Sequence, residues 1–254
     1  MKKVLITGMS GLIGGLLRRH LEELGGYELT ALNRRAVEGV KCFQADITDP
    51  EAIKPAFEGQ DVVVHMAAYL GNGTFSDDIE GHVAGNVMGV YNVYEAARLA
   101  GVKRVVFASS GSTVRGFERV PPYSDIAAAQ YDRVPENFPM VTGEMVHPMG
   151  IYGAAKAWGE QLGHHFSDAY GLSILCVRIG LVLREDRPTS DRQYSVYLSH
   201  RDVCQIFQKC IDAPDDLLYG VFMGISNNKW NYRDIEYPRQ VLGYEPQDSS
   251  DDYR

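Results

Sequence analysis

Tyr152 and Lys156 form the pair of side chains with the clearest chemical potential in this chain. Their spacing places them on one face of a helix, one turn apart. A phenol with a pKa of about 10 is a poor base at neutral pH, and a nearby ammonium stabilises its phenolate. A serine hydroxyl across the site can hold a substrate oxygen while Tyr152 exchanges a proton with it. These residue types suit proton transfer coupled to hydride transfer to a nicotinamide. Such a pair also arises by chance, so its meaning depends on the surrounding elements.

Three glycines near the N-terminus, Gly8, Gly11 and Gly14, form the second candidate motif. They follow the apolar run Val4–Thr7 and overlap a helical pattern that begins at Leu12. Strand, glycine turn and helix in this order are typical of a dinucleotide site. The first glycine permits the turn, the second the approach of a pyrophosphate, and the third the packing of helix on strand. The helix N-terminus offers free N–H groups to the phosphates. A plain glycine turn is the alternative.

The turn Asn33-Arg34-Arg35 follows a second predicted strand, Tyr27–Leu32. A dinucleotide fold reads the adenosine ribose at this position, about 20 residues beyond the glycines. An acidic residue would bind the 2′-hydroxyl and repel a 2′-phosphate, whereas this chain has an amide and two cations. The turn therefore favours NADP, with NAD still open. The alternative is a solvated turn that happens to be basic.

Four more apolar runs are typical of buried parallel strands, namely Val40–Phe43, Val62–His65, Val105–Ala108 and Leu172–Ile179. Asp46 follows the first of these and is placed to contact an adenine. The small residues at positions 66–68 leave room for a ligand above the sheet. His65 is expected to be a packed residue. Ser109 and Ser110 end the third run, where they are either a strand stop or a substrate contact.

Apolar residues recur at three- and four-residue spacing over His82–Ala100 and Ile151–Tyr170, which predicts two helices. Asn86 lies inside the first helix, where a buried amide needs a partner. Between the two helices, Arg115–Met149 is irregular and too long for an ordinary connection, which indicates a binding loop or lid.

The alternation of strand and helix predicts an α/β fold, a Rossmann-type doubly wound parallel sheet with a small C-terminal substrate-binding portion. At 254 residues the chain is long enough for one such domain. We expect residues 1–180 to form the dinucleotide-binding core. Residues 181–254 are expected to form most of the substrate-binding portion, interleaved with the core.

The composition is that of a globular protein with a formal net charge of −8, which argues against nucleic acid or an anionic membrane as a partner. The four cysteines have neither disulfide nor metal-site spacing, so we expect reduced thiols and no metal site. No signal peptide or membrane span is evident. The expected location is the cytoplasm.

Taken together, these motifs resemble the extended short-chain dehydrogenase/reductase superfamily, also called the NAD-dependent epimerase/dehydratase family. The matching segments are TGMSGLIG, HMAA, GNVMGVYNVYEAAR, FASS and YGAAK. The resemblance implies that Ser110, Tyr152 and Lys156 are catalytic, and that Lys156 also hydrogen-bonds the nicotinamide ribose. The expected NAD- or NADP-binding residues are Gly8, Ser10, Gly11, Leu12, Ile13, Gly14, Asn33, Arg34, Arg35, Asp46, Ile47, Met66, Ala67, Ala68, Asn86, Ala108, Tyr152, Lys156 and Ile179.

Three later segments, SHRDV, GISNN and VLGYEPQDSS, resemble the branch that contains uronate dehydrogenases and archaeal sugar-phosphate dehydrogenases. That branch oxidises a sugar at C1 to a lactone, which implies a small sugar-like substrate. Arg192 matches an arginine that holds the substrate carboxylate in the uronate enzymes. Leu181 stands where those enzymes have a serine, and Asn33 stands where the branch has an acid. Gly111 and Ser112 replace an asparagine and a histidine. The expected substrate-binding residues are Ser110, Gly111, Ser112 and Arg192.

Two alternatives stay open. One is a nucleotide-sugar epimerase or dehydratase with retained NAD, although only about 75 residues after Gly180 remain to bury a nucleotide. The other is a non-catalytic dinucleotide-binding regulator, which typically lacks the Tyr/Lys pair.

The two long predicted helices resemble the pair that forms a four-helix dimer interface in this superfamily. Their patterns leave Tyr91, Leu99, Trp158 and Phe166 as candidates for a second apolar face. A homodimer is therefore expected.

Overall fold

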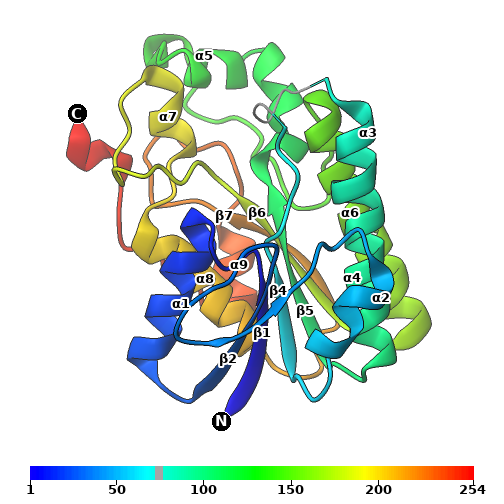
Figure 1. The fold of residues 1–254 in the computed structure, drawn as a ribbon. Coiled ribbons are helices and arrows are strands. Elements are labelled where there is room, and N and C mark those ends of the chain that lie inside the picture. The colour runs from blue at the N-terminus through cyan, green and yellow to red at the C-terminus, as the bar shows by residue number, and fades with distance from the viewer. Residues whose placement is uncertain (72–76) are drawn as a thin grey trace.

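A parallel sheet in the order β3-β2-β1-β4-β5-β6-β7 forms the centre of the molecule (Figure 1). The structure is a computed structural model that describes residues 1–71 and 77–254. The strands are β1 (Lys2–Thr7), β2 (Tyr27–Asn33), β3 (Lys41–Gln44), β4 (Val62–His65), β5 (Arg104–Ser110), β6 (Ser173–Ile179) and β7 (Tyr219–Gly224). The helices are α1 (Leu12–Leu24), α2 (Pro50–Ile53), α3 (Ile79–His82), α4 (Gly89–Leu99), α5 (Tyr123–Ala127), α6 (Gly150–Tyr170), α7 (Asp191–Val196), α8 (His200–Ile211) and α9 (Glu236–Leu242).

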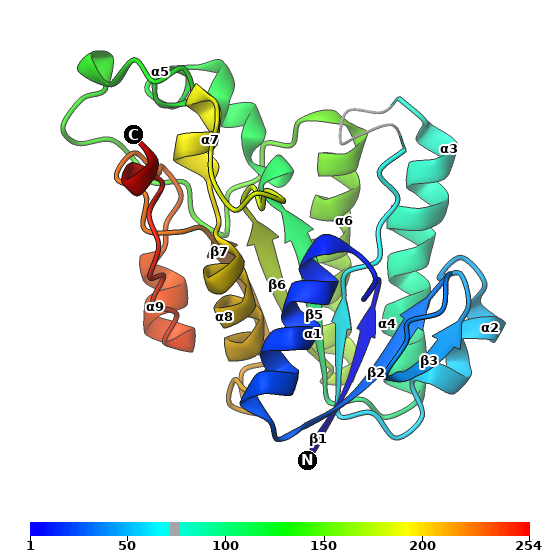
Figure 2. The same cartoon turned by 60° about the vertical axis from the view of Figure 1, so that its left-hand side comes forward.

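The helices cover both faces of the sheet, as the two ribbon views show (Figures 1 and 2). Successive side chains of a strand point to opposite faces. Val4 and Ile6 of β1 therefore join the apolar cluster under α1 and α8, whereas Leu5 joins the cluster under α2, α4 and α6. The chain runs outward from β1 through β2 to β3 and then returns to β4. The strand order thus reverses between β1 and β4, the position at which such sheets bind ligands. The predicted Rossmann-type sheet is confirmed.

The serine pair belongs to the sheet itself. The predicted strand Val105–Ala108 is longer in the structure, because β5 continues through Ser109 and Ser110. Ser110 pairs in register with Ile179 of β6. The hydroxyl of Ser110 is thereby fixed at the carboxyl end of a central strand.

The predicted helix from His82 to Ala100 begins earlier and is not uniform. Asp78 caps its start by accepting a hydrogen bond from the Gly81 N–H at 3.0 Å. After α3 the chain forms a π-helical segment, Val83–Met88, before it continues as α4. A Cβ at Gly85 would lie 2.7 Å from the Tyr69 Cβ, so the π-helical segment packs directly against the loop after β4. Such widened turns are frequent at functional sites.

A buried ion pair anchors the irregular segment to the sheet. Arg178 of β6 donates two hydrogen bonds to Glu160 of α6, at 2.8 and 2.7 Å, and both side chains are fully buried. Arg178 also donates to the Met145 carbonyl at 2.8 Å. Residues of the predicted loop are therefore fixed to the core. Its short helix α5 lies beside α7 beyond the carboxyl ends of the strands (Figure 2). Whether the segment acts as a lid stays a prediction.

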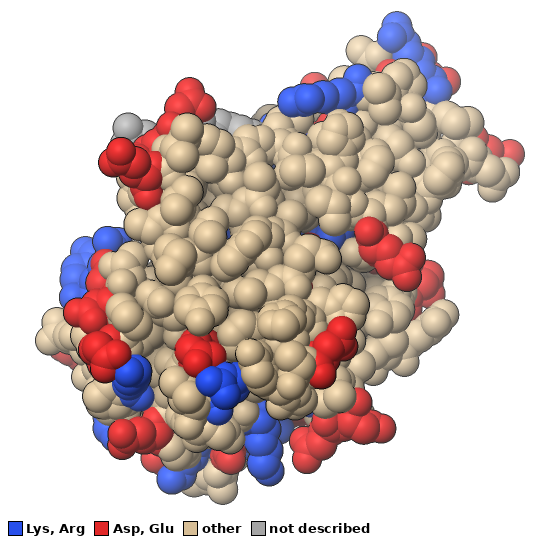
Figure 3. Space-filling view, turned by 90° about the vertical axis from the view of Figure 1, so that its right-hand side faces the viewer, with Lys and Arg blue, Asp and Glu red and all other residues tan. Residues whose placement is uncertain are grey.

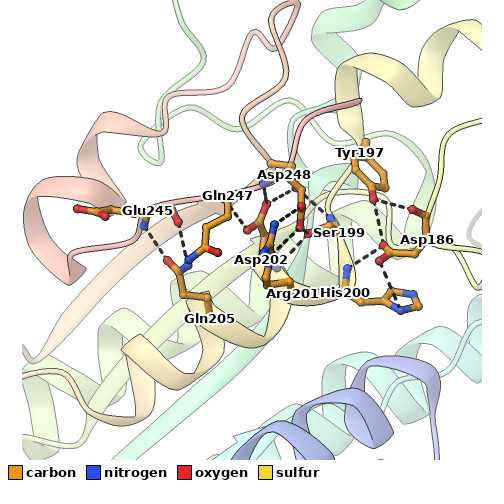
Figure 4. Close-up of polar contacts among 11 residues, drawn as sticks. Asp186, Tyr197, Ser199, His200, Arg201, Asp202, Gln205, Glu245, Gln247 and Asp248 are labelled. Atoms are coloured by element: carbon orange, nitrogen blue, oxygen red, sulfur yellow. Dashed lines mark hydrogen bonds and ion pairs between the residues drawn. The ribbon is translucent and has the colours of Figure 1, made fainter. Parts of the chain in front are cut away.

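The SHRD segment ties the C-terminal tail to α8 (Figure 4). Asp202 is fully buried and accepts hydrogen bonds from the Ser226 hydroxyl at 2.6 Å and from the Gln247 N–H at 2.8 Å. Burial raises the pKa of the Asp202 carboxyl. Ser199 caps α8 by accepting from the Asp202 N–H and donates to Asp248 at 2.7 Å. These contacts hold the tail against the helix.

The same segment fixes the loop that follows β6 (Figure 4). His200 Nε2 lies 2.7 Å from the Leu183 carbonyl oxygen, and the His200 N–H donates to Asp186 at 2.8 Å. The Tyr197 hydroxyl donates to the Asp186 carbonyl at 2.7 Å. The SHRD residues therefore shape the loop and the tail, and their contacts account for the motif.

The four cysteines are free thiols. Cys176, Cys204 and Cys210 are buried, and Cys42 is half-buried. Among the described residues, no helix is long and apolar enough to cross a membrane.

Candidate active site

A crevice of about 670 Å³ lies at the carboxyl ends of β1, β2 and β4. The predicted cofactor residues that line it are Gly8, Ser10, Gly11, Asn33, Arg34, Arg35, Asp46, Ile47, Met66, Ala67 and Ala68. This is the reversal point of the strand order, and its size is that of a small-molecule site.

The close packing of the glycine turn requires residues without side chains at Gly8 and Gly14. Gly8 has a φ of +72°, and a Cβ there would lie 2.9 Å from the Ala67 nitrogen. A Cβ at Gly14 would lie 2.6 Å from the Gly8 oxygen, so the close packing of α1 on the turn also requires glycine. Leu12 and Ile13 open α1, and N–H groups in the first turn of a helix lack intrahelical partners. The turn and these N–H groups fit a pyrophosphate.

The ribose-reading position is held by Ser10 and Asn33. The Asn33 amide donates to the Ser10 hydroxyl at 2.7 Å and accepts from its N–H at 3.4 Å. Asn33 is buried, whereas the Arg34 side chain is 76% exposed and lies 3.9 Å from Asp46. Arg35 lines the crevice. The turn therefore presents an uncharged amide and two arginines to the crevice.

Ser110, Tyr152 and Lys156 meet at the end of β5, as the sequence predicts. Burial raises the pKa of Tyr152 to about 12, and the nearby Ser110 hydroxyl offsets part of this rise. Lys156 is buried, and burial lowers its pKa to about 8. Its ammonium donates to the Ala108 carbonyl at 2.8 Å and lies 4.8 Å from the centre of the Phe107 ring. Burial is thus the main influence on the pKa of Tyr152, and the expected effect of Lys156 on the phenol stays a prediction.

The Asn86 amide has protein partners, and its expected place near the cofactor stays a prediction. Its oxygen accepts from the Tyr69 N–H at 2.8 Å, and its nitrogen donates to the Tyr69 carbonyl at 2.7 Å. The same nitrogen lies 2.9 Å from His82 Nδ1. The amide is therefore satisfied by protein groups, and its effect is to hold the loop after β4 beside the crevice.

Arg192 is not the free carboxylate-binding fork that the sequence suggests. Its guanidinium donates to both oxygens of Glu118, at 2.6 and 2.9 Å. The Tyr232 hydroxyl also donates to Glu118, at 2.7 Å. Glu118 belongs to the irregular segment and Arg192 to α7, so this pair joins two parts of the chain that lie far apart in sequence.

The family that matches residues 4–196 is described as the NAD dependent epimerase/dehydratase family. The chain belongs to this family. It is 30% identical over 260 residues to an NAD-dependent glucose-6-phosphate dehydrogenase of Haloferax volcanii, with 98% of this chain and 95% of the relative covered. It is 32% identical over 263 residues to an L-arabinose 1-dehydrogenase of the same organism, with 98% of each chain covered.

A solved structure of the family has the same fold. It is a mutant uronate dehydrogenase from Agrobacterium tumefaciens in complex with NAD, and it is 27% identical to this chain. The TM-score is 0.81, with 100% of this chain and 88% of that chain covered.

Two further buried residues, His82 beside Tyr152 and Arg233 beside Gly111, do not follow from the sequence patterns. His82 is fully buried, its ring centre lies 6.1 Å from that of Tyr152, and its Nε2 has no hydrogen-bond partner among the described residues. Arg233 follows β7 and is only 1% exposed. His82 begins a predicted helix, and Arg233 lies in a segment without periodicity. The sequence therefore gave no signal for either.

Proposed function

We propose that this family member is an NAD(P)-dependent dehydrogenase that oxidises C1 of a small sugar, sugar acid or sugar phosphate to a lactone. The observation that carries the proposal is the convergence of Ser110, Tyr152 and buried Lys156 at the end of β5, where Lys156 donates to the Ala108 carbonyl and the Ser110 hydroxyl lowers the pKa of Tyr152. This group stands at the same edge of the sheet as the crevice. The relatives named for glucose 6-phosphate and arabinose support a sugar substrate.

In the proposed reaction Ser110 holds the C1 oxygen, and Tyr152 takes the proton of the C1 hydroxyl. The bound nicotinamide supplies the hydride acceptor. Lys156 holds the ribose next to it, and its positive charge favours the phenolate form of Tyr152. Gly8, Gly11 and the N-terminus of α1 hold the pyrophosphate.

We propose NADP as the preferred cofactor. Asn33 carries no charge that would repel a 2′-phosphate, and Arg34 and Arg35 flank the crevice.

Four unpaired thiols support a reducing compartment, which we take to be the cytoplasm.

We also propose that residues 181–254 supply most of the substrate side of a single domain. Arg192 and Arg233 come from this part of the chain, and both approach Glu118 of the irregular segment. The core up to residue 180 supplies the crevice and the catalytic trio.

We propose a homodimer formed through α4 and α6. Tyr91 is 40% exposed, Leu99 59% and Trp158 37%, which leaves apolar side chains on the outer side of these helices. Figure 3 views this side of the molecule, and the centre of the face is largely uncharged. Phe166 does not belong to this face: it is buried in the core against Tyr94. The sequence pattern predicted an exposed Phe166, and this prediction was wrong because the side of α6 that carries Phe166 packs on the core.

The experiment that tests the activity is a screen of aldoses, uronates and sugar phosphates with NAD and with NADP. Formation of reduced nicotinamide by the wild type, with loss of turnover in Tyr152→Phe, supports the proposal. Conversion of a nucleotide sugar without net nicotinamide turnover would overturn it in favour of an epimerase or dehydratase.

A further inference from the structure

Arg233 is a buried cation whose hydrogen-bonding capacity is mostly unused. Its Nη2 donates to the Tyr232 hydroxyl at 2.8 Å and lies 3.5 Å from Glu118. Its Nε and Nη1 are buried and have no hydrogen-bond partner among residues 1–71 and 77–254. These two nitrogens carry three of the five N–H donors of a guanidinium. Burying N–H donors without partners costs stability. Unpartnered donors that are nevertheless buried therefore indicate that a ligand accepts from them.

The guanidinium of Arg233, including its unused Nε donor, lies beside the end of β5. A Cβ placed on Gly111 would lie 3.8 Å from Arg233 Nη2 and 3.9 Å from Nε. Gly111 directly follows Ser110, whose hydroxyl lies near enough to Tyr152 to lower the pKa of the phenol. Glycine at this position leaves space next to the guanidinium where other residues would place a side chain. A molecule held by Ser110 therefore has the guanidinium of Arg233, with its unused Nε donor, as a neighbour.

Positively charged side chains outnumber negatively charged ones in the ion-pair cluster around Arg233. Ion pairs run from Arg115, Arg192 and Arg233 to the single carboxylate of Glu118. Glu118 already accepts two hydrogen bonds from Arg192 and one from Tyr232. Its attraction to Arg233 acts only across 3.5 Å. Three cations around one anion leave room for further negative charge.

We propose, on the basis of the proposed function, that Arg233 is a specificity residue that binds an oxyanion group of the sugar while C1 lies at Tyr152 and Ser110. The ligand chemistry is a phosphate monoester or a carboxylate, and the charge of the cluster favours the phosphate dianion. Arg192 does not bind this group, because its guanidinium already donates to both oxygens of Glu118. Guanidinium groups bind both anions through paired N–H donors.

The test compares Arg233→Met and Arg233→Lys with the wild type on glucose 6-phosphate, glucuronate and neutral glucose. The wild type is expected to prefer an anionic sugar to glucose. Arg233→Met should lower kcat/KM for that sugar by about 10- to 100-fold, with less than about a threefold change for glucose. Arg233→Lys should recover part of the loss, because it restores the charge without the planar fork. The ratio of losses on the two anions identifies which group binds.

The matched control is Arg119→Met, which removes an exposed arginine from the segment that contains Glu118. This variant should leave kcat/KM unchanged for all three substrates. An equal loss on glucose and on the anionic sugars in Arg233→Met would overturn the proposal, as would a wild type that prefers glucose. If the methionine variant does not fold, the lysine variant and the wild-type preference still decide the matter.

A binding measurement separates this proposal from the proposed function. 1,5-Anhydroglucitol 6-phosphate has no hydroxyl at C1 and cannot be oxidised there, so its binding by calorimetry requires no turnover. Binding that weakens about 10-fold or more in Arg233→Met supports the oxyanion site even if no aldose is oxidised. Aldose oxidation without any dependence on Arg233 in turnover or binding would leave the dehydrogenase intact and overturn the oxyanion site.

Discussion

Lys156 and Tyr152 face one another across one turn of α6, with 5.6 Å between the lysine ammonium and the centre of the phenol ring. The ammonium donates one hydrogen bond to the Ala108 carbonyl of β5. The Ser110 hydroxyl lowers the pKa of the phenol. The phenol therefore has the serine and the lysine as its two polar neighbours, and its own burial is the larger influence on its pKa.

This geometry predicts the pH dependence of turnover. Tyr152→Phe should lower turnover at least about 100-fold with nearly unchanged cofactor binding, and Ser110→Ala should have a milder effect. In the wild type, oxidation should accelerate with rising pH as Tyr152, with its raised pKa, loses its proton. Ser110→Ala should move this rise to still higher pH, because the Ser110 hydroxyl lowers the pKa of the phenol.

Profiles of kcat/KM against pH measure both effects. Tyr170→Phe, an exposed tyrosine at the end of the same helix, is the control and should match the wild type. Near-normal turnover in Tyr152→Phe would remove Tyr152 from the mechanism. If Ser110→Ala has no effect, Ser112 is the remaining candidate for the substrate oxygen.

The Glu160–Arg178 pair predicts a large loss of stability when one partner is removed. Glu160→Ala leaves the fully buried Arg178 without its carboxylate, which should cost about 3–5 kcal/mol in the free energy of unfolding. Glu236→Ala is the control, because Glu236 pairs with Arg239 in the exposed part of α9 and should cost less than about 1 kcal/mol. Urea unfolding of the two variants compares them, and equal losses would contradict the assignment.

The sequence predicted the sheet and the glycine turn because these depend on local pattern. Apolar runs indicate strands, and three glycines between a strand and a helix have few structural uses. Tyr152 and Lys156 were predictable for the same reason, since four residues separate them on one helix. The Glu118–Arg192 pair spans 74 residues and joins two segments without periodicity. Neither its formation nor the free donors of Arg233 follow from any local pattern.

His65 predicts a loss of stability in acid. The Thr7 hydroxyl accepts from the N–H groups of Met66 and Ala67, so its proton goes to His65 Nδ1 at 2.8 Å. Burial, and to a smaller extent the Lys156 charge, lowers the pKa of His65 to about 3 from 6.5. Between these values the unfolded chain binds a proton that the folded chain does not. Stability therefore falls as the pH drops from 6.5 toward 3, by up to about 1.4 kcal/mol per pH unit from this residue.

His65→Asn keeps a hydrogen-bond acceptor near the Thr7 hydroxyl and removes the titration. The variant should lose less stability than the wild type between pH 6.5 and 4, as measured by urea unfolding. His164→Asn, on the exposed side of α6, should leave the wild-type slope unchanged. An identical acid slope in His65→Asn and the wild type would show that His65 does not govern it.

The apolar outer side of α4 and α6 predicts the state of assembly. Leu99→Lys and Trp158→Glu should each shift the protein from dimer to monomer, because a charge would be buried without a partner in the interface. Leu24→Glu is the control, an exposed leucine at the end of α1 on the other side of the sheet. Light scattering at micromolar concentration measures the mass. A monomeric wild type would refute the dimer.

The turn after β2 predicts the choice of cofactor. Arg35→Ala should lower kcat/KM with NADP about 10-fold, because one charge-assisted bond to the 2′-phosphate is lost. The kcat/KM with NAD should stay nearly unchanged. Arg34→Ala should have the smaller effect, since that side chain is 76% exposed. Asn33→Asp keeps an acceptor for the Ser10 N–H but adds a charge that repels the phosphate, so it should shift preference toward NAD. Steady-state kinetics with both cofactors measure all three. A hundredfold preference for NAD in the wild type would show that a residue outside Asn33–Arg35 rejects the phosphate.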